Sequence, residues 1–515
     1  MEIADLGRLS VTSVSRNVAF NFLGKSWAAL MSLAFVPLYI RFLGIEAYGL
    51  LGFFSLLLVV LSVLDLGLGS TLNRELARHT ARQDGPTNES RDLLRTLEVP
   101  YGIVGILLGV SVAALAPFLA RHWVNAASLP VATVREAIIL MGVVVAAQWP
   151  TTLYAGGLRG LQQQGLWNAI SASAATLRGV GAALVLWKLS ATILAFFTWQ
   201  AAVSILQTLV TRWYLWRSLP GEVRPELRFD LLVRVWRFAA GMTAITLVSL
   251  FLAQLDRLVL SKLTSLKEFG YYTLASAVAL GLYALITPVF EAFFPRLSQL
   301  VAVGDEPTLR SLYHRGCQLM AVLVLPVAAV VAFFSRDLIL VWTGSSDLAA
   351  RSHVLVTIMI AGTALNGLMN LPYALQLASG WTRLTFLTNV VALLFLAPLA
   401  VILAKRYGSF GVAWITVILN GGYLAFLPHI IHLRLLRGEK GRWYLWDVGI
   451  PLAIAVIVAA IGHAVLAPPA TASRPLRLLL VSVVYAVTLG AVLGATPSLR
   501  QNALGWLARR RVRIA

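Results

Sequence analysis

Six ionisable side chains lie inside long apolar stretches of the sequence, where an unused charge is costly. They comprise three bases and three acids: Lys25, Arg178 and Arg257, and Asp65, Asp256 and Glu291. An ionised side chain at the centre of a bilayer costs roughly 2.5 to 3.5 kcal/mol on insertion scales. Each of these groups therefore needs an opposite charge, a wet cavity or a ligand. The chemistry available to them is ion pairing, a protonation switch or the binding of a charged group.

Lys25 and Asp65 form the first candidate pair. Lys25 lies about 8 residues from the inner end of the first predicted helix and Asp65 about 6 from that of the second, so both lie roughly 9 to 12 Å deep. Because buried charges usually pair, one interpretation is a structural clamp between them. The other is that Lys25 faces a ligand, with the neighbouring acid as a protonation switch.

The remaining candidates differ in how each charge is compensated. Asp256 and Arg257 are adjacent and point about 100° apart on a helix, so they do not satisfy each other. Arg257 either faces a cavity or snorkels to the outer surface. Arg178 lies closer to the middle of its helix and has no acidic neighbour in the sequence. Asp65 and Glu291 are candidates for carrying a coupling proton or sodium ion. The alternative for both is a helix-packing contact or hydrogen bonding of the N-terminal type at a helix break.

The composition places these side chains in a polytopic membrane protein. Of 515 residues, 59% are hydrophobic and only 12% are charged, and the mean hydropathy is +0.80. No water-soluble domain of this length keeps such a balance. The net charge of +20 would suggest nucleic acid in a soluble chain. Here the bases lie mostly between apolar stretches, so we expect a membrane and no nucleic acid as partner.

Apolar stretches of about 18 to 26 residues predict about fourteen spanning helices. They cover residues 17–40, 46–71, 100–120, 134–156, 166–187, 190–211, 239–260, 271–294, 317–334, 353–378, 384–404, 410–432, 445–466 and 476–495. With the N-terminus inside, the inner segments hold about 27 Lys and Arg residues and the outer loops about 12. This asymmetry fits the positive-inside rule and predicts that both termini are cytoplasmic.

An internal match divides the chain into two halves of like topology. A shift of 221 residues lays "RFLGIEAYGLLGF" on "KLTSLKEFGYYTLA", matching Gly49 with Gly270. The predicted parts are a six-helix bundle, an Arg-rich cytoplasmic linker, a second six-helix bundle, and two additional helices with a basic tail: 1–211, 212–238, 239–435 and 436–515. The predicted fold class is all-α, with two pseudo-symmetric bundles around a central cavity, the arrangement of alternating-access transporters.

Four smaller signals complete the pattern. Gly105 and Gly109 lie four residues apart and predict close helix packing. His429 and His432 lie three apart without an evident third ligand, so we expect an interfacial position and no metal or cofactor. The lone Cys317 likewise excludes a disulfide within the chain and a cysteine-based zinc site. Tryptophans beside arginines at span ends predict an interfacial belt: Trp213, Trp216, Trp443 and Trp446.

Three segments carry a family resemblance. They are "NVAFNFLGKSWAALMSLAFVPLYIRFLGIEAYGLLGF", "LYAGGLRGLQQQGLWNAI" and "LAQLDRLVLSKLTSLKEFGYYTLASAVALGLYALITPVFEAFFPRLSQL". With them, residues 16–435 resemble the bacterial polysaccharide flippases, which translocate O-antigen and exopolysaccharide repeat units. The superfamily also holds the lipid II flippase and multidrug exporters of the MATE type.

The resemblance implies a cargo and a place in the cell. The cargo would be an oligosaccharide on a polyprenyl pyrophosphate, moved across the bacterial inner membrane by alternating access for cell-surface polysaccharide biosynthesis. Lys25, Arg178 and Arg257 would hold the pyrophosphate, because guanidinium makes bidentate phosphate contacts and ammonium supplies a point charge. Other polysaccharide-assembly proteins are implied as candidate partners.

Two other function classes stay open. A cation-coupled drug or small-molecule antiporter of the same superfamily would favour acidic cavity residues, whereas this chain carries three bases within its spans. A membrane polysaccharide polymerase or ligase would need acid and base groups on a sizeable outer loop. The outer loops around 121–133 and 335–352 lack such a cluster. We therefore predict a transporter rather than an enzyme.

Overall fold

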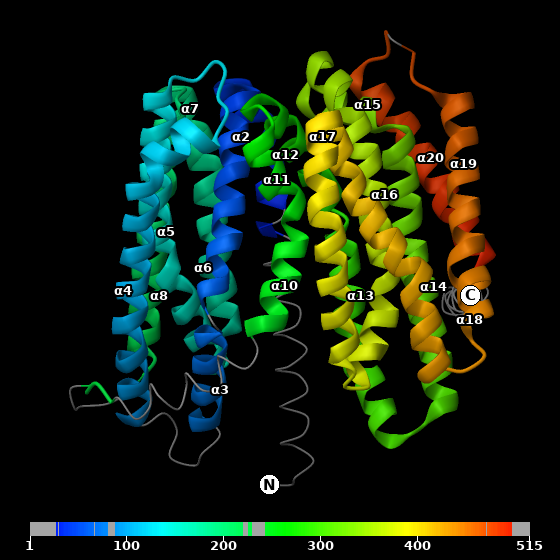
Figure 1. The fold of residues 1–515 in the computed structure, drawn as a ribbon, viewed down its shortest axis with the longest axis horizontal. Coiled ribbons are helices and arrows are strands. Elements are labelled where there is room, and N and C mark those ends of the chain that lie inside the picture. Colours follow the sequence, from blue (N-terminus) through cyan, green and yellow to red (C-terminus); the bar gives the residue numbers. More distant parts are fainter. Residues whose placement is uncertain are drawn as a thin grey trace, which may run out of the picture. The chain divides into compact units, whose positions relative to one another are not determined.

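The computed structural model describes residues 27–28, 30–65, 67–80, 88–219, 225–228, 243–469 and 471–496, with only the backbone of 243–246. Within these residues the chain is helical, and its one β contact is an isolated bridge between Asn125 and Ser265. In this part of the chain, 11 helices are long and apolar enough to cross a membrane (Figure 1). The prediction of an all-α polytopic membrane protein is confirmed.

Each predicted span coincides with helix in the described residues, the first only from residue 27 and the seventh only from residue 243 onward. Two continuous helices each contain parts of two predicted spans, separated at a glycine with positive φ. These glycines are Gly44 (φ 83°) in α2 (Val36–Ser62) and Gly408 (φ 59°) in α17 (Thr382–Arg434). Glycine adopts such a conformation at no steric cost. The seventh predicted span is divided at Gln254 into α10 (Thr243–Ala253) and α11 (Leu255–Leu263).

The chain divides into two compact units, one ending at Gly270 and the other beginning at Tyr271. The helices α10 and α11 belong to the first unit because they contact α2, and α10 also contacts the short helix η1 (Val63–Asp65). The boundary between the units therefore falls inside α12 (Leu266–Leu280). The division into two six-helix bundles joined by 212–238 stays a prediction.

The first unit is organised around α5. Its further elements are α3 (Leu68–Thr80), α4 (Asn88–Phe118), the π turn η2 (Leu119–Trp123), α5 (Val131–Gly160), α6 (Gln164–Thr176), the π turn η3 (Leu177–Gly181), α7 (Ala182–Lys188) and α8 (Ile193–Arg217). Helix α5 contacts α3, α4, α6 and α8. A Cβ added to Gly109 would lie 2.7 Å from that of Ala146, and one on Gly105 would lie 3.1 Å from the Trp149 ring. The close packing predicted at Gly105 and Gly109 is confirmed.

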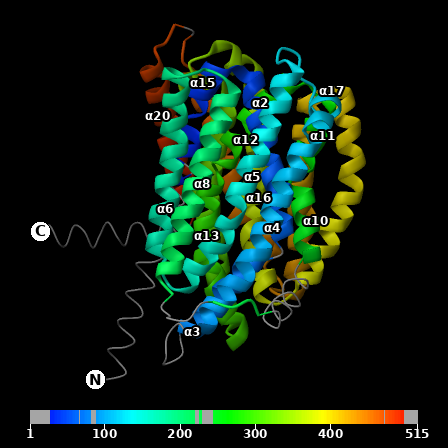
Figure 2. The same ribbon diagram turned by 90° about the vertical axis from the view of Figure 1, so that its left-hand side faces the viewer.

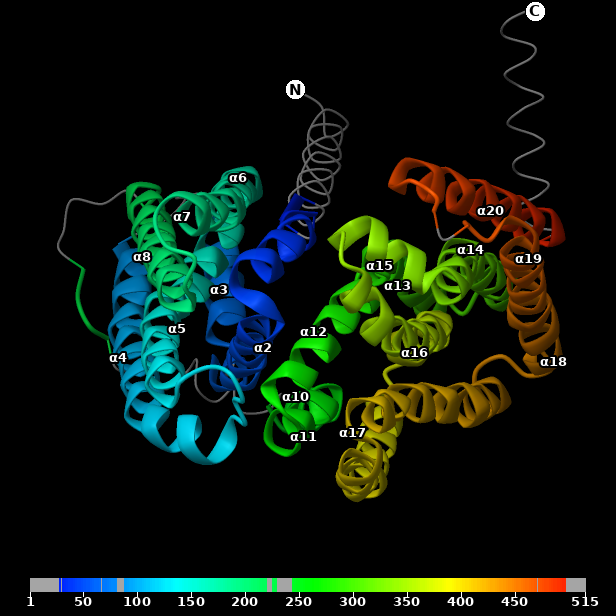
Figure 3. The same cartoon turned by 90° about the horizontal axis from the view of Figure 1, so that it is seen from above.

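The second unit is organised around α16 and α14. Its further elements are α13 (Tyr283–Val303), α14 (Glu306–Phe333), α15 (Ser335–Thr343), α16 (Ser346–Ala378), α18 (Lys440–Arg442), the π turn η4 (Trp443–Gly449), α19 (Ile450–Leu466) and α20 (Arg474–Ala495). Helix α16 contacts α13, α14, α15 and α17. The C-terminal helices α19 and α20 pack on each other and on α14 (Figure 3).

The tryptophan belt needs one correction. Trp213 and Trp446 are exposed, as expected of side chains at a membrane interface. Trp443 instead is fully buried, and its indole N–H donates to Cys317 Sγ at 3.3 Å. The reason is that η4, which contains Trp443, packs against α14.

Candidate functional site

Arg178 lies in η3, a π turn that joins α6 to α7. A π turn disturbs the regular helical hydrogen bonding, and such turns are frequent at functional sites. Here side chains bind the carbonyls of the turn. The Trp199 indole N–H donates to the Leu177 carbonyl at 2.9 Å, and the Tyr39 hydroxyl donates to the Gly179 carbonyl at 3.3 Å. These bonds hold the backbone that presents Arg178.

The guanidinium of Arg178 has neutral partners, both on α8. Its Nη2 donates to Gln207 Oε1 at 2.8 Å and to Ser204 Oγ at 3.2 Å. In the part of the chain that the structure describes, no carboxylate lies within ion-pair distance of it. Neutral groups position the guanidinium but leave its charge uncompensated. Such a group is suited to bind an anion with two parallel N–H donors.

A cavity of about 290 Å³ lies between α6 and α8, which Figure 2 shows side by side. It adjoins Arg178, because Leu177 and Gln207 both line it. Ser173 and Tyr214 are the other polar residues of a mainly apolar lining. The volume is at the lower end of the range for ligand sites. The cavity can therefore hold a phosphate group or a length of hydrocarbon chain, but not a whole oligosaccharide.

Arg257 and Asp256 lie at the start of α11. The Asp256 carboxylate accepts a hydrogen bond from the backbone N–H of Arg257 at 2.8 Å. It thus compensates an N–H group in the first helical turn, where a negative charge is favourable. Gln254, the residue between α10 and α11, has a buried side-chain oxygen without a hydrogen-bond partner among the described residues.

The other predicted site residues lie on separate elements. Lys25 is outside the described residues, so its pairing with Asp65 stays a prediction. Asp65 ends η1 and accepts a hydrogen bond from the Tyr101 hydroxyl, whose ring stacks on Trp149 with centroids 5.5 Å apart. Sequence spacing did not indicate this partner. Glu291 lies on the exposed side of α13 in the second unit.

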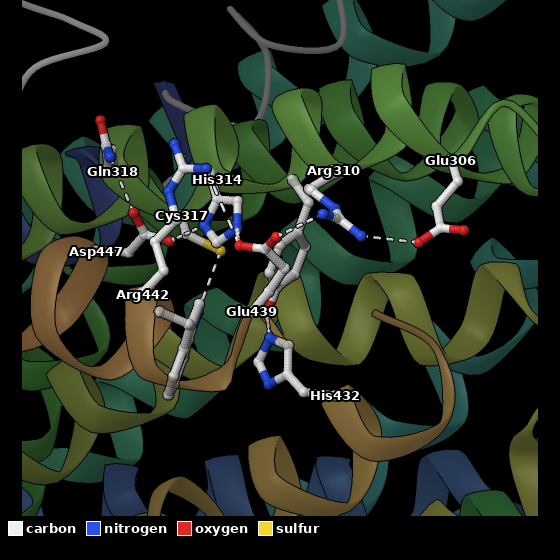
Figure 4. Close-up of polar contacts among 11 residues, drawn as sticks. Glu306, Arg310, His314, Cys317, Gln318, His432, Glu439, Arg442 and Asp447 are labelled. Carbon is white, nitrogen blue, oxygen red and sulfur yellow. Dashed lines mark hydrogen bonds and ion pairs between the residues drawn. The ribbon is translucent and has the colours of Figure 1, made fainter. Parts of the chain in front are cut away.

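A cluster of buried ionisable groups in the second unit was not expected from the sequence (Figure 4). His314 on α14 is 1% exposed and lies between two acids. Its Nδ1 contacts Asp447 of η4, and its Nε2 lies 3.0 Å from Glu439 Oε2. Gln318 donates to Asp447 at 2.9 Å, and Arg310 lies 3.0 Å from Glu439. The cluster joins α14 to the C-terminal helices.

The residues of this cluster carry charges of both signs. Glu306, Glu439 and Asp447 supply three negative charges, and Arg310 and Arg442 supply two positive ones. The His314 ring lies between the Asp447 and Glu439 carboxylates, with one carboxylate at each ring nitrogen. His314 is 133 positions from Asp447 in the sequence, so no local pattern reveals the pair.

Comparison with known proteins identifies relatives along most of the chain. The model of the family "Polysaccharide biosynthesis protein" matches residues 14–301, and the MatE family model matches residues 241–402. A putative O-antigen transporter of Shigella flexneri is 21% identical over 419 residues, which cover 81% of this chain and 97% of that protein.

Two solved structures share the fold at low sequence identity. The lipid II flippase MurJ in an inward closed conformation has a TM-score of 0.69 at 13% identity, over 92% of this chain and 97% of that one. An inward-facing multidrug resistance MATE family transporter of the MOP superfamily has a TM-score of 0.62 at 15% identity, over 79% of this chain and 95% of that one. At these identities the likeness concerns the fold.

Proposed function

The chain belongs to the polysaccharide biosynthesis protein family, and we propose that it is a flippase for an oligosaccharide linked to a polyprenyl pyrophosphate. The cargo would cross the inner membrane by alternating access, for the assembly of a cell-surface polysaccharide. The names of its relatives, an O-antigen transporter and a lipid II flippase, support this class of cargo. We place both termini in the cytoplasm on the basis of the Lys and Arg distribution.

The observation that carries the proposal is the guanidinium of Arg178. It is held by Gln207 and Ser204, both neutral, and adjoins a cavity between α6 and α8. A cation without a carboxylate partner is costly in a membrane unless an anionic ligand or water compensates it. A pyrophosphate supplies that compensation, and it is the part of the proposed cargo least able to cross hydrocarbon alone.

The other ionisable candidates take secondary roles in the proposal. Lys25 and Arg257 would add positive charge along the path of the pyrophosphate. Asp65 and Glu291 would be the acids that exchange a coupling proton or sodium ion, and Asp256 would fix the first turn of α11 beside Arg257. Other polysaccharide-assembly proteins would supply and consume the lipid-linked sugar.

The test is translocation of a lipid-linked oligosaccharide by the full chain in proteoliposomes. Arg178→Gln should lower apparent affinity for the cargo roughly ten- to a hundredfold, because a hydrogen bond to a charged group contributes about 1.5 to 3 kcal/mol. Arg217→Gln is the matched control, since Arg217 lies over the Trp213 ring at 5.2 Å on the same helix as the Arg178 partners. Wild-type transport by Arg178→Gln would contradict the assignment of the anion site.

A double substitution separates the two interpretations of Lys25. If Lys25 only clamps Asp65, transport lost in Lys25→Ala should return in Lys25→Ala with Asp65→Ala, because the damage comes from an orphaned buried charge. If Lys25 binds cargo, the double variant should stay inactive at normal protein levels.

Export of a cationic drug is the second candidate function. The MatE family model matches residues 241–402, and a MATE transporter shares the fold. The neutral partners of Arg178 argue against it, because a cationic drug would be repelled by an uncompensated guanidinium. Dye efflux from cells that express the chain, without translocation of lipid-linked sugar, would favour the antiporter.

A further inference from the structure

A cavity of about 370 Å³ lies at the turn between α17 and α18, in the second unit. Its lining is basic: His429, His432, Leu433, Arg437, Gly438 and Lys440. The turn joins two candidate membrane spans, one ending at Arg434 and the other beginning at Lys440. The cavity, which we call the α17–α18 pocket, therefore lies at the level where lipid head groups begin.

Both bases of the α17–α18 pocket have neutral partners. Lys440 Nζ lies 2.8 Å from His429 Nδ1, and Arg437 Nε donates to the Leu433 carbonyl at 3.3 Å. No carboxylate of the described chain lies within ion-pair distance of either base. The pocket thus carries two positive charges that nothing in the described protein neutralises.

The shape of the turn keeps the nearest acid out of the pocket. Glu439 lies between the two bases in the sequence, but its side chain is buried against His314 and Arg310 of α14. Gly438 makes this possible with φ 85°, a left-handed conformation that favours glycine. The acid is used in the buried cluster, while the bases on either side of it remain at the surface.

The two histidines of the pocket differ in what they can offer. His432 is 1% exposed, and its ring nitrogens already bind the Pro428 carbonyl at 2.7 Å and the Tyr313 hydroxyl at 3.1 Å. His429 is exposed and holds Lys440. The pair is therefore not arranged to share a metal, and His429 instead positions a base of the pocket.

Apolar side chains on α17 continue from the pocket toward the centre of the span. Phe426, Ile430 and Leu433 follow each other at helical spacing and are 71%, 38% and 59% exposed. An exposed apolar ridge next to a basic pocket has the two properties of a phospholipid site. The ridge contacts acyl chains, and the bases contact a phosphate.

We propose that the α17–α18 pocket binds the phosphate of an anionic phospholipid head group, with the acyl chains along Phe426, Ile430 and Leu433. Arg437 and Lys440 supply the charge. Basic pockets beside membrane spans are typical sites for anionic head groups. A free phosphate ion offers the same charge, but it makes no use of the apolar ridge, so the observations favour the lipid.

The test is native mass spectrometry of the full chain in detergent with added phosphatidylglycerol or phosphatidylcholine. Arg437→Gln with Lys440→Gln should lower affinity for phosphatidylglycerol about 25-fold, from about fivefold for each base. Binding of phosphatidylcholine should not change. Arg434→Gln is the matched control, because Arg434 lies over the Trp381 ring at 4.4 Å and does not line the pocket.

Each outcome decides the proposal. Unchanged binding of phosphatidylglycerol by the double variant overturns it. Displacement of phosphatidylglycerol by millimolar inorganic phosphate, with the same dependence on the two bases, overturns the lipid in favour of a free anion. Should the double variant fail to fold, Lys440→Glu replaces it, since this single reversal at an exposed position should abolish the preference for the anionic lipid.

Discussion

His314→Ala should destabilise the second unit strongly, because it leaves the buried Asp447 carboxylate without the ring that contacts it. Asp447 is 0% exposed, and its Oδ2 contacts the His314 ring while its Oδ1 keeps the amide of Gln318 at 2.9 Å. Removing one partner of a buried ion pair costs about 3 to 5 kcal/mol. Glu439 keeps Arg310 at 3.0 Å, and Asp447 keeps one donor. We therefore expect the lower end, about 3 kcal/mol.

The assay is the free energy of unfolding of the full chain, from titration of mixed micelles with sodium dodecyl sulfate. His314→Gln with Asp447→Asn should recover most of the loss, because two neutral groups need no buried cation. Arg351→Ala is the control, since its ion pair with Asp347 has both side chains more than half exposed and such pairs contribute about 0 to 1 kcal/mol.

The reasoning is refuted by a small or an additive effect. A cost below about 1 kcal/mol for His314→Ala would mean that the ring does not stabilise the buried Asp447 carboxylate. Additive losses for His314→Gln and Asp447→Asn would mean that the two groups do not interact.

Three further predictions concern helix packing, a helix cap and topology. Gly109→Leu should lower the free energy of unfolding by about 1 to 3 kcal/mol in the same titration, because a Cβ at this position already meets Ala146; an unchanged value would contradict the packing. The Thr308 hydroxyl and the Thr308 N–H, the latter at 3.1 Å, donate to Asp305 and lower the Asp305 pKa. The cap is thus present at neutral pH and lost as the pH falls through that lowered value, so amide protection at Thr308 should decrease in acid in the wild type and be absent at every pH in Asp305→Ala. A cysteine introduced at Glu89 should not react with an impermeant thiol reagent added outside, and the buried Cys317 should not react either. Labelling at position 89 would contradict the predicted topology.

Most of the fold could be predicted because crossing a membrane requires long apolar helices. The positions of the spans follow from hydropathy alone, and the turns at Gly44 and Gly408 fall between predicted spans. The π turn at Arg178 could not be predicted, because tertiary contacts from Trp199 and Tyr39 hold it. A π turn contains one residue more than a regular helical turn, and hydropathy along an apolar helix does not reveal that residue.

The candidate site could be predicted only in part. A charge within an apolar stretch singles out Arg178, but its partners Ser204 and Gln207 are 26 and 29 positions away on another helix. Asp65 was paired in prediction with a base, whereas the described structure supplies the Tyr101 hydroxyl. Opposite charges can be matched by inspection of a sequence, but hydroxyl and amide partners are too common for such matching.

The buried cluster around His314 bears on whether the C-terminal helices form a removable module. Truncation of the chain after α17 would delete Glu439 and Asp447, the two acids that enclose the His314 ring. His314 and Gln318 would then lose the carboxylates that their side chains contact. A shortened protein would therefore need apolar replacements at both positions before it could insert and fold. The C-terminal helices and the polar side of α14 therefore have to be kept or replaced together.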